Sequence, residues 1–107
     1  MAIIEPSAVI NEGAQIMMGA SIGSGCKIGE NSIINSGAIL SHDSIIGKHS
    51  HIAPGAILAG NVQIGDRVLI GMGATIFISS KIGENVIVNN GVHIFSDVEK
   101  NEIIKNK

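Results

Sequence analysis

The chain is poor in aromatic residues: among its 107 residues are two Phe and neither Trp nor Tyr, although 45% of the residues are hydrophobic. A globular core of irregular shape normally uses aromatic rings to fill its volume. Only two residues are Pro, whereas 14 are Gly, so the turns must depend on glycine. We therefore expect one domain with a narrow, regular core of aliphatic side chains.

Other scarcities exclude whole classes of protein. The formal net charge is −2 and no basic run occurs, so no nucleic-acid partner is expected. The single cysteine, Cys26, excludes an intrachain disulfide and favours a reducing compartment. No signal peptide and no apolar run of membrane-spanning length is recognisable, so we expect no membrane span and predict a cytoplasmic location.

A period of six residues runs through the sequence. Ile, Leu or Val opens every hexad from residue 4 to residue 94, and the fifth place holds only Ala, Ser, Cys or Val. The fifth place of one hexad and the first place of the next flank a single outward residue, which is the alternation of a short strand. The fourth place is Gly, Asn or Asp in 12 of the 16 hexads, and these residue types tolerate a positive φ, so this place indicates a turn.

A strand and a turn in every hexad, with three hexads per coil, predict an all-β fold. The fold is a parallel β-helix of about five 18-residue coils, each stacked on the one before it. Residues 1–98 are expected to form this domain and residues 99–107 a short C-terminal tail. Cys26 occupies a fifth place, so we expect it in the core and not as a nucleophile.

The sixth place of each hexad points outward and defines three faces. The first face carries Ile3, Ser21, Ile39, Ile57, Thr75 and His93, the second Val9, Lys27, Ile45, Gln63, Lys81 and Glu99, and the third Gln15, Ile33, His51, Leu69 and Ile87. The second face is polar and is expected to meet solvent, whereas a monomer would not tolerate the apolar outer surface of the other two. Because the first and third faces share an edge, we predict a cyclic homotrimer around that edge, with a dimer as the alternative.

Three of the four histidines, His42, His49 and His51, lie within ten residues of one another. His42 falls in a turn between the first and second faces, and His51 points outward from the third face. In a trimer, neighbouring subunits would bring these two positions to one cleft. His49 is expected to be a turn residue and His93 a surface residue.

The hexads resemble those of the hexapeptide-repeat acyltransferases over essentially the whole chain, and the segment ILSHDSIIGKHSHIAPGAILAGNVQIG, residues 39–65, carries a narrower resemblance. Within that family it is most similar to the sugar acetyltransferases related to sialic acid O-acetyltransferases and bacillosamine-pathway N-acetyltransferases. The resemblance implies a left-handed β-helix, a homotrimer, and acetyl-CoA as co-substrate without a metal. It also implies a hydroxyl or amine of a sugar or nucleotide sugar as the acceptor.

The resemblance assigns the chemistry to a histidine and a carboxylate. Carried over by position, His42 resembles the general base and Asp43 the carboxylate that raises its basicity. Acetyl transfer from a thioester needs a base that removes a proton from the attacking hydroxyl or amine, and an imidazole does this near neutral pH.

The resemblance also implies binding residues. His51 resembles a histidine that contacts acetyl-CoA, and Gly60 resembles the glycine that leaves room for the acyl group. Met72 and Asn90 lie in turns that the family uses along the CoA arm. Asn35 matches a position near the acceptor in some members.

Two departures from the family keep other functions open. The sugar acetyltransferases usually carry an N-terminal α/β domain and a C-terminal closing turn, and neither is recognisable here. A non-catalytic trimeric scaffold or binding module is therefore the alternative, and a folded trimer without CoA binding would distinguish it. A metal enzyme of the γ-carbonic-anhydrase kind uses the same fold, but the required positions 36 residues beyond His42 and His51 hold Ile78 and Ile87.

Overall fold

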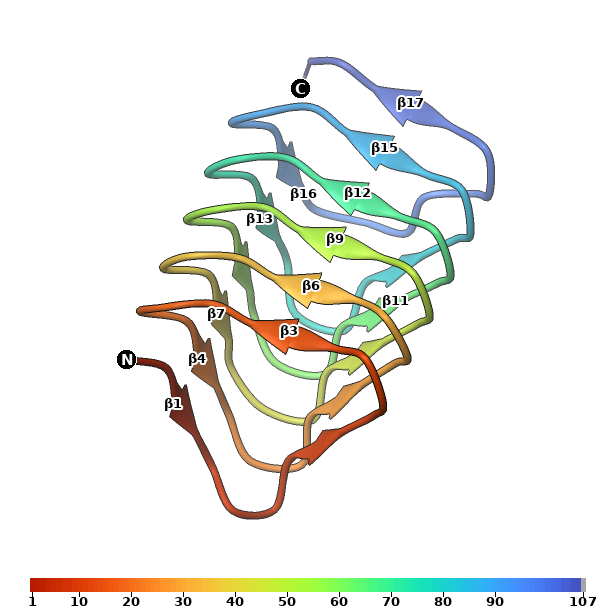
Figure 1. Cartoon of the computed structure of the whole chain (residues 1–107). Coiled ribbons are helices and arrows are strands. Elements are labelled where there is room, and N and C mark those ends of the chain that lie inside the picture. Colours follow the sequence, from red (N-terminus) through yellow and green to blue (C-terminus); the bar gives the residue numbers. More distant parts are fainter. Residues whose placement is uncertain (107) are drawn as a thin grey trace.

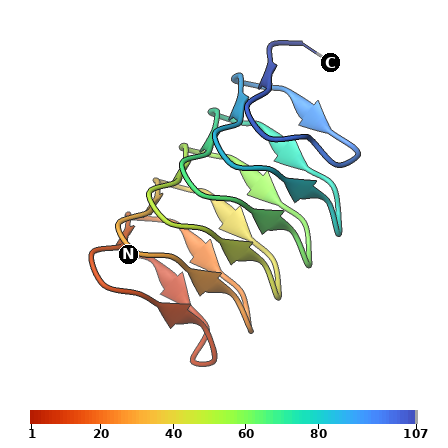
Figure 2. The same ribbon diagram turned by 90° about the vertical axis from the view of Figure 1, so that its right-hand side faces the viewer.

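A computed structural model describes residues 1–106, and it contains only short strands and turns in that part of the chain. The coils are stacked along one axis, with the two termini at opposite ends (Figures 1 and 2). The stack measures 34 × 20 × 20 Å. The expected parallel β-helix is confirmed, and it completes close to six turns where the hexads predicted about five.

Every strand is two residues long and pairs in parallel with the strands one coil away. The first face consists of β1 (Ile3–Ile4), β4 (Ser21–Ile22), β7 (Ile39–Leu40), β10 (Ile57–Leu58), β13 (Thr75–Ile76) and β16 (His93–Ile94). The second face consists of β2 (Val9–Ile10), β5 (Lys27–Ile28), β8 (Ile45–Ile46), β11 (Gln63–Ile64) and β14 (Lys81–Ile82). The third face consists of β3 (Gln15–Ile16), β6 (Ile33–Ile34), β9 (His51–Ile52), β12 (Leu69–Ile70), β15 (Ile87–Val88) and β17 (Ile103–Ile104).

The register stacks equal places of the hexad on one another. His51 pairs with Ile33 on one side and Leu69 on the other, so each partner is 18 residues away. The first and fifth places form buried ladders along the axis, because each hexad adds the same two inward side chains. Cys26 is fully buried in such a ladder, and this burial raises the pKa of its thiol.

The turns have the conformation that the fourth place predicted. Asp43 has a φ of 53° and His49 a φ of 57°, and every fourth place from Gly13 to Gly91 lies in this left-handed region. His49 is therefore confirmed as a turn residue. The corner between the third and first faces carries glycine at this place in each coil, whereas the other two corners also use residues with side chains.

The last coil departs from the period of six. Ile82 pairs with Val98 and Ile87 pairs with Ile103, so the spacing falls from 18 to 16 residues. Strand β17 (Ile103–Ile104) lies within residues 99–107, the segment that we expected to form a tail, and it continues the sheet of the third face.

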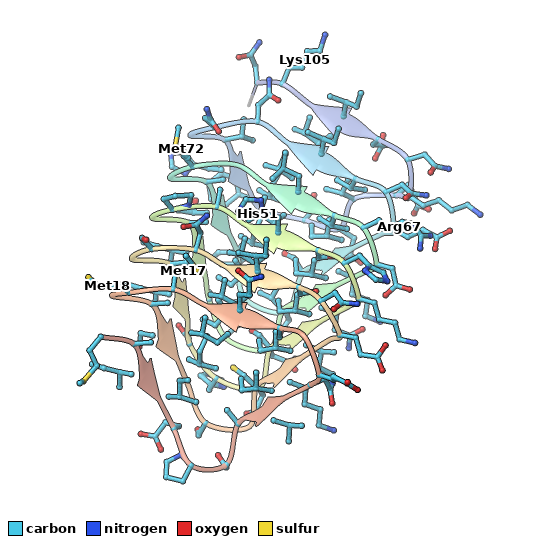
Figure 3. The ribbon with its side chains drawn as sticks, in the orientation of Figure 1. Met17, Met18, His51, Arg67, Met72 and Lys105 are labelled. Atoms are coloured by element: carbon cyan, nitrogen blue, oxygen red, sulfur yellow. The ribbon has the colours of Figure 1, made fainter. Side chains whose placement is uncertain are left out.

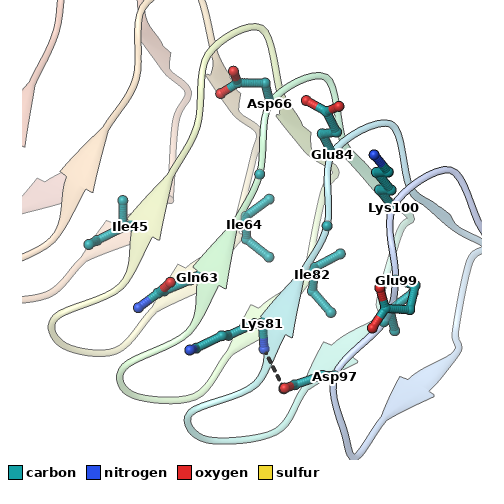
Figure 4. A pocket seen from close by; sticks show the side chains of 13 residues that line it. Ile45, Gln63, Ile64, Asp66, Lys81, Ile82, Glu84, Asp97, Glu99 and Lys100 are labelled. Atoms are coloured by element: carbon teal, nitrogen blue, oxygen red, sulfur yellow. Dashed lines mark hydrogen bonds between the residues drawn. The ribbon is translucent and has the colours of Figure 1, made fainter.

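A groove of about 610 Å³ lies along the second face where the coil is shortened (Figure 4). Asp97 closes one end, because its Oδ1 accepts a hydrogen bond from the Lys81 backbone N–H at 2.8 Å. Asp66, Glu84 and Lys100 form a rim of mixed charge. None of the site residues expected from the sequence lines this groove.

The residues described by the structure include no helix that is both long enough and apolar enough to span a membrane.

Candidate functional site

His42 and Asp43 form a hydrogen-bonded pair on the corner between the first and second faces. The turn at Asp43 directs its carboxylate toward the preceding side chain, and His42 Nδ1 lies 3.2 Å from Asp43 Oδ2. A carboxylate can only accept, so Nδ1 carries a proton, and in the neutral ring Nε2 keeps its lone pair. Both side chains are more than half exposed, at 54% and 65%, so solvent screens their attraction. The pair therefore orients the imidazole as a proton acceptor at Nε2.

The imidazole of His42 lies against Gly60, one coil further along the chain. A Cβ atom at Gly60 would overlap Nε2 and Cε1 of the ring. The backbone also connects the two coils, because the Asn61 N–H donates to the His42 carbonyl at 2.7 Å. Glycine at this position thus makes room for the ring of His42 itself. A role of Gly60 in accommodating the acyl group stays a prediction.

His51 and Asn35 contact each other on the other side of the molecule. His51 points outward from the third face (Figure 3), and Asn35 lies in the turn that follows the same face one coil earlier. Asn35 Nδ2 is 3.1 Å from His51 Nε2, and Asn35 Oδ1 accepts a hydrogen bond from the Ser36 N–H at 2.7 Å. Both side chains are half-buried. The sequence did not predict this contact, although a separation of 16 residues places the two positions on adjacent coils.

Met72 and Asn90 occupy equal places at the corner between the third and first faces. The Met72 backbone N–H donates to Asn90 Oδ1 at 2.8 Å, which connects two successive turns. The Met72 side chain is half exposed and extends from this corner (Figure 3). Both residues are therefore accessible along the edge that borders the third face.

The expected site residues thus form two groups within one chain. His42, Asp43 and Gly60 lie on the corner between the first and second faces. The second group lies on the third face or on its corner with the first face, and it consists of Asn35, His51, Met72 and Asn90. No described contact joins His42 to His51.

The first and third faces are apolar on the outside, as the hexads predicted. Ile39 and Ile57 on the first face and Leu69 on the third each expose about two fifths of their surface. Phe77 and Phe95 stack beside the first face with ring centroids 6.0 Å apart, and they line a small cavity of about 160 Å³. Such an area of exposed apolar side chains is typical of an interface.

The described residues hold no group of three or more His, Cys, Asp or Glu side chains arranged to bind a metal ion.

Comparison with known families identifies the repeat. The profile of the bacterial transferase hexapeptide (six repeats) matches residues 7–42 and 43–77, and that of the hexapeptide repeat of succinyl-transferase matches residues 61–96. The chain belongs to the bacterial hexapeptide-repeat transferases. No curated protein sequence matches it.

Several solved structures are similar to this chain. The acetyltransferase domain of PglB from Neisseria gonorrhoeae FA1090, in complex with acetyl coenzyme A, is 32% identical with a TM-score of 0.94, over 95% of this chain and 50% of that chain. A mutant of perosamine N-acetyltransferase from Caulobacter crescentus, in complex with CoA and GDP-perosamine, is 30% identical with a TM-score of 0.71. The match covers 95% of this chain and 51% of that chain. WeeI from Acinetobacter baumannii AYE is 26% identical with a TM-score of 0.69, and the match covers 98% of this chain and 55% of that chain. The first two of these structures confirm the resemblance to sugar acetyltransferases, and this chain spans about half the length of each of the three.

Proposed function

We propose that this hexapeptide-repeat transferase moves an acetyl group from acetyl-CoA to a hydroxyl or amine of a sugar or nucleotide sugar. The observation that carries the proposal is the His42–Asp43 pair, which leaves Nε2 of the imidazole available as a base at an exposed corner. The similar structures in complex with acetyl-CoA, or with CoA and GDP-perosamine, support the choice of donor and the class of acceptor.

His42 Nε2 is the proton acceptor in the proposed reaction. It takes the proton from the acceptor hydroxyl or amine as that oxygen or nitrogen attacks the thioester carbonyl carbon. The tetrahedral intermediate then collapses, the carbon–sulfur bond breaks, and the CoA sulfur leaves with the proton that the imidazolium returns. No cysteine nucleophile takes part, since the only thiol of the chain, Cys26, is buried in the core.

Asp43 supports this cycle in two ways. Its carboxylate holds the proton on Nδ1, so that Nε2 faces the reactants as an acceptor. A carboxylate beside an imidazole also favours the imidazolium that forms when the base is protonated. Because the pair is exposed, we expect orientation to be the larger of the two contributions.

A homotrimer would unite the two groups of site residues. The exposed apolar side chains of the first and third faces support contact between these faces of neighbouring subunits. In a cyclic trimer around the edge shared by the first and third faces, the first face of one subunit, which His42 borders, would meet the third face of its neighbour, which carries His51. Acetyl-CoA would then bind between subunits, with its acetyl group at His42. The buried free thiol of Cys26 fits a reducing, cytoplasmic location.

Calorimetry with acetyl-CoA on the intact oligomer, beside the His51→Ala variant, tests the proposal. Saturable binding near one site per subunit, weakened by the substitution, is the expected result and would justify a screen of sugar acceptors. A folded oligomer that takes up no acetyl-CoA would contradict the proposal. It would favour a non-catalytic scaffold or binding module.

A further inference from the structure

The orientation of the Asn35 amide follows from its backbone neighbour. The N–H of Ser36 can only donate, and it lies 2.7 Å from the atom that it contacts on the Asn35 side chain, so that atom is the oxygen Oδ1. The amide nitrogen Nδ2 therefore points the other way, toward the imidazole of His51. A flipped amide would bring two donors together at Ser36, which the hydrogen-bond geometry excludes.

The orientation of the amide determines the tautomer of His51. Nδ2 is only a donor, and it lies 3.1 Å from His51 Nε2, so Nε2 must present its lone pair. In the neutral ring the proton is then on Nδ1. An imidazolium has no lone pair at Nε2 and would lose this hydrogen bond.

The surroundings of His51 keep the ring in this place. Its neighbours in the sheet are Ile33 and Leu69, whose side chains stand on either side of the half-buried ring. Aliphatic neighbours offer Nδ1–H no acceptor. Nδ1–H makes no hydrogen bond among the described residues, so it remains a donor for a bound molecule.

His42 and His51 are the same tautomer, but His42 offers a hydrogen-bond acceptor and His51 a donor. His42 is protonated on Nδ1 by its contact with Asp43, and its Nε2 lone pair is available to a reactant. The Nε2 lone pair of His51 is occupied by Asn35, so His51 offers only an N–H. This difference explains in physical terms why His42, and not His51, is suited to be the base.

We infer that Asn35 is a positioning residue, which holds His51 as the Nδ1–H tautomer so that this N–H donates to a carbonyl oxygen of bound acetyl-CoA. The inference rests on the proposed function, and it gives Asn35 a task other than contact with the acceptor. Removing the amide would let the ring exchange between tautomers and rotate. A fraction of the population would then face acetyl-CoA with a lone pair, which a carbonyl oxygen does not bind.

Nitrogen NMR of ¹⁵N-histidine-labelled protein without ligand tests the tautomer directly, with the His51→Ala variant to assign the signals. We expect a protonated Nδ1 and an unprotonated Nε2 for His51 in the wild-type protein. In Asn35→Ala, both nitrogens should move toward the averaged position of a tautomer mixture. In Asn35→Asp, a carboxylate that can only accept should move the proton to Nε2. Alanine fits at this place, because Ala53 occupies it one coil further.

Calorimetry with acetyl-CoA on the same variants tests the donor role. Asn35→Ala should weaken binding by roughly 2- to 10-fold, the range for loss of one oriented hydrogen bond, and Asn35→Asp should weaken it further. Asn89→Ala is the matched control, since Asn89 occupies the same hexad place at the same corner, three coils or about 14 Å away. It should leave the His51 signals unchanged, and Asn11→Ala, at the same hexad place on the corner between the second and third faces, is the control that should leave the affinity unchanged.

Failure of this inference is distinguishable from failure of the proposed function. If the wild-type protein binds no acetyl-CoA, the proposed function fails and the donor role falls with it, while the NMR signals still report on Asn35. If the wild-type protein binds acetyl-CoA but Asn35→Ala leaves the His51 tautomer unchanged, the positioning role is overturned. A changed tautomer with unchanged affinity would overturn the donor role.

Discussion

At the scale of single residues, the proposed chemistry depends on one imidazole and on the absence of one methyl group. His42 is oriented by Asp43 through Nδ1, and its ring occupies the space that a side chain at position 60 would fill. The same atoms thus define both the direction of the lone pair and the place of the ring. The role of the His42 ring and the space at position 60 can each be tested by one substitution.

Replacement of His42 by Ala should lower the rate of acetyl transfer by about 10²- to 10⁴-fold, because the acceptor loses its general base. Oligomerisation and acetyl-CoA binding should persist, since the side chain is exposed and the backbone contacts of the turn remain. Steady-state kinetics beside calorimetry measure both effects. His49→Ala, in the turn of the next hexad, is the control and should leave the rate unchanged. Undiminished turnover by His42→Ala would remove this residue from the mechanism.

Replacement of Gly60 by Ala should displace the imidazole, because the added methyl group would overlap the ring of His42. We expect a loss of activity, and a free energy of unfolding lowered by about 0.5–1.5 kcal/mol, the cost of a side chain forced off its rotamer, since the exposed ring can move toward solvent. Denaturant unfolding of the single variants and of the double variant His42→Ala/Gly60→Ala measures the coupling. Without the His42 ring the added methyl group has room, so Gly60→Ala should change the free energy of unfolding of the His42→Ala variant little. If Gly60→Ala lowers the free energy of unfolding equally in the wild-type protein and in the His42→Ala variant, the steric explanation is contradicted.

At the scale of the strand and turn, buried serines replace part of the backbone hydrogen bonding. Ser50 Oγ donates to the Gly65 carbonyl at 2.7 Å and accepts from the Val68 N–H at 2.9 Å, and Ser32 makes the equivalent contacts one coil earlier. The sequence showed only that these places require small residues. It did not show that the hydroxyl groups connect successive coils.

Replacement of Ser50 by Ala should lower the free energy of unfolding by about 1–3 kcal/mol. The reason is that the Gly65 carbonyl and the Val68 N–H would lose a partner in the buried interior. Denaturant unfolding followed by circular dichroism is the measurement. Ser41→Ala, at an exposed position, is the control. An unchanged denaturation midpoint for Ser50→Ala would mean that the Gly65 carbonyl and the Val68 N–H find backbone partners without the hydroxyl group.

The strands and turns were predictable from the hexads, and the end of the helix was not. Each hexad repeats the same information, so strand positions, turn places and register follow from counting. After residue 94 the coil shortens by two residues, and Val98 and Ile103 pair out of the period. A single irregular coil has no following repeat that would reveal its register.

At the scale of the whole molecule, two of the three outer faces are apolar and carry residues from both groups of the proposed site. Ile39 and Ile57 face outward on one side and Leu69 on the other, while the second face sets one exposed isoleucine, Ile45, among Lys27, Gln63 and Lys81. If the proposed trimer forms, neither group is complete without a neighbouring subunit. Assembly and acetyl-CoA binding should therefore fail together.

Replacement of Leu69 by Glu should convert the trimer to a folded monomer, because a charge would be buried where two apolar faces meet. Sedimentation velocity measures the assembly and circular dichroism the fold. The monomer should no longer bind acetyl-CoA, since His51 and His42 of different subunits would separate. Gln63→Glu on the second face is the matched control and should stay trimeric. A trimeric Leu69→Glu protein would exclude the third face from the interface.

The sequence by itself determined the coil, the buried ladders, the turn places and the polarity of the three faces, because these properties repeat with the backbone every six residues. It also singled out His42, Asp43 and His51 through their resemblance to a known signature. Only the tertiary structure decided that Asn35 contacts His51, that Gly60 makes room for the His42 ring, and that the last coil is shortened. These features depend on which side chains meet between adjacent coils and on their rotamers, and no period in the sequence encodes such contacts.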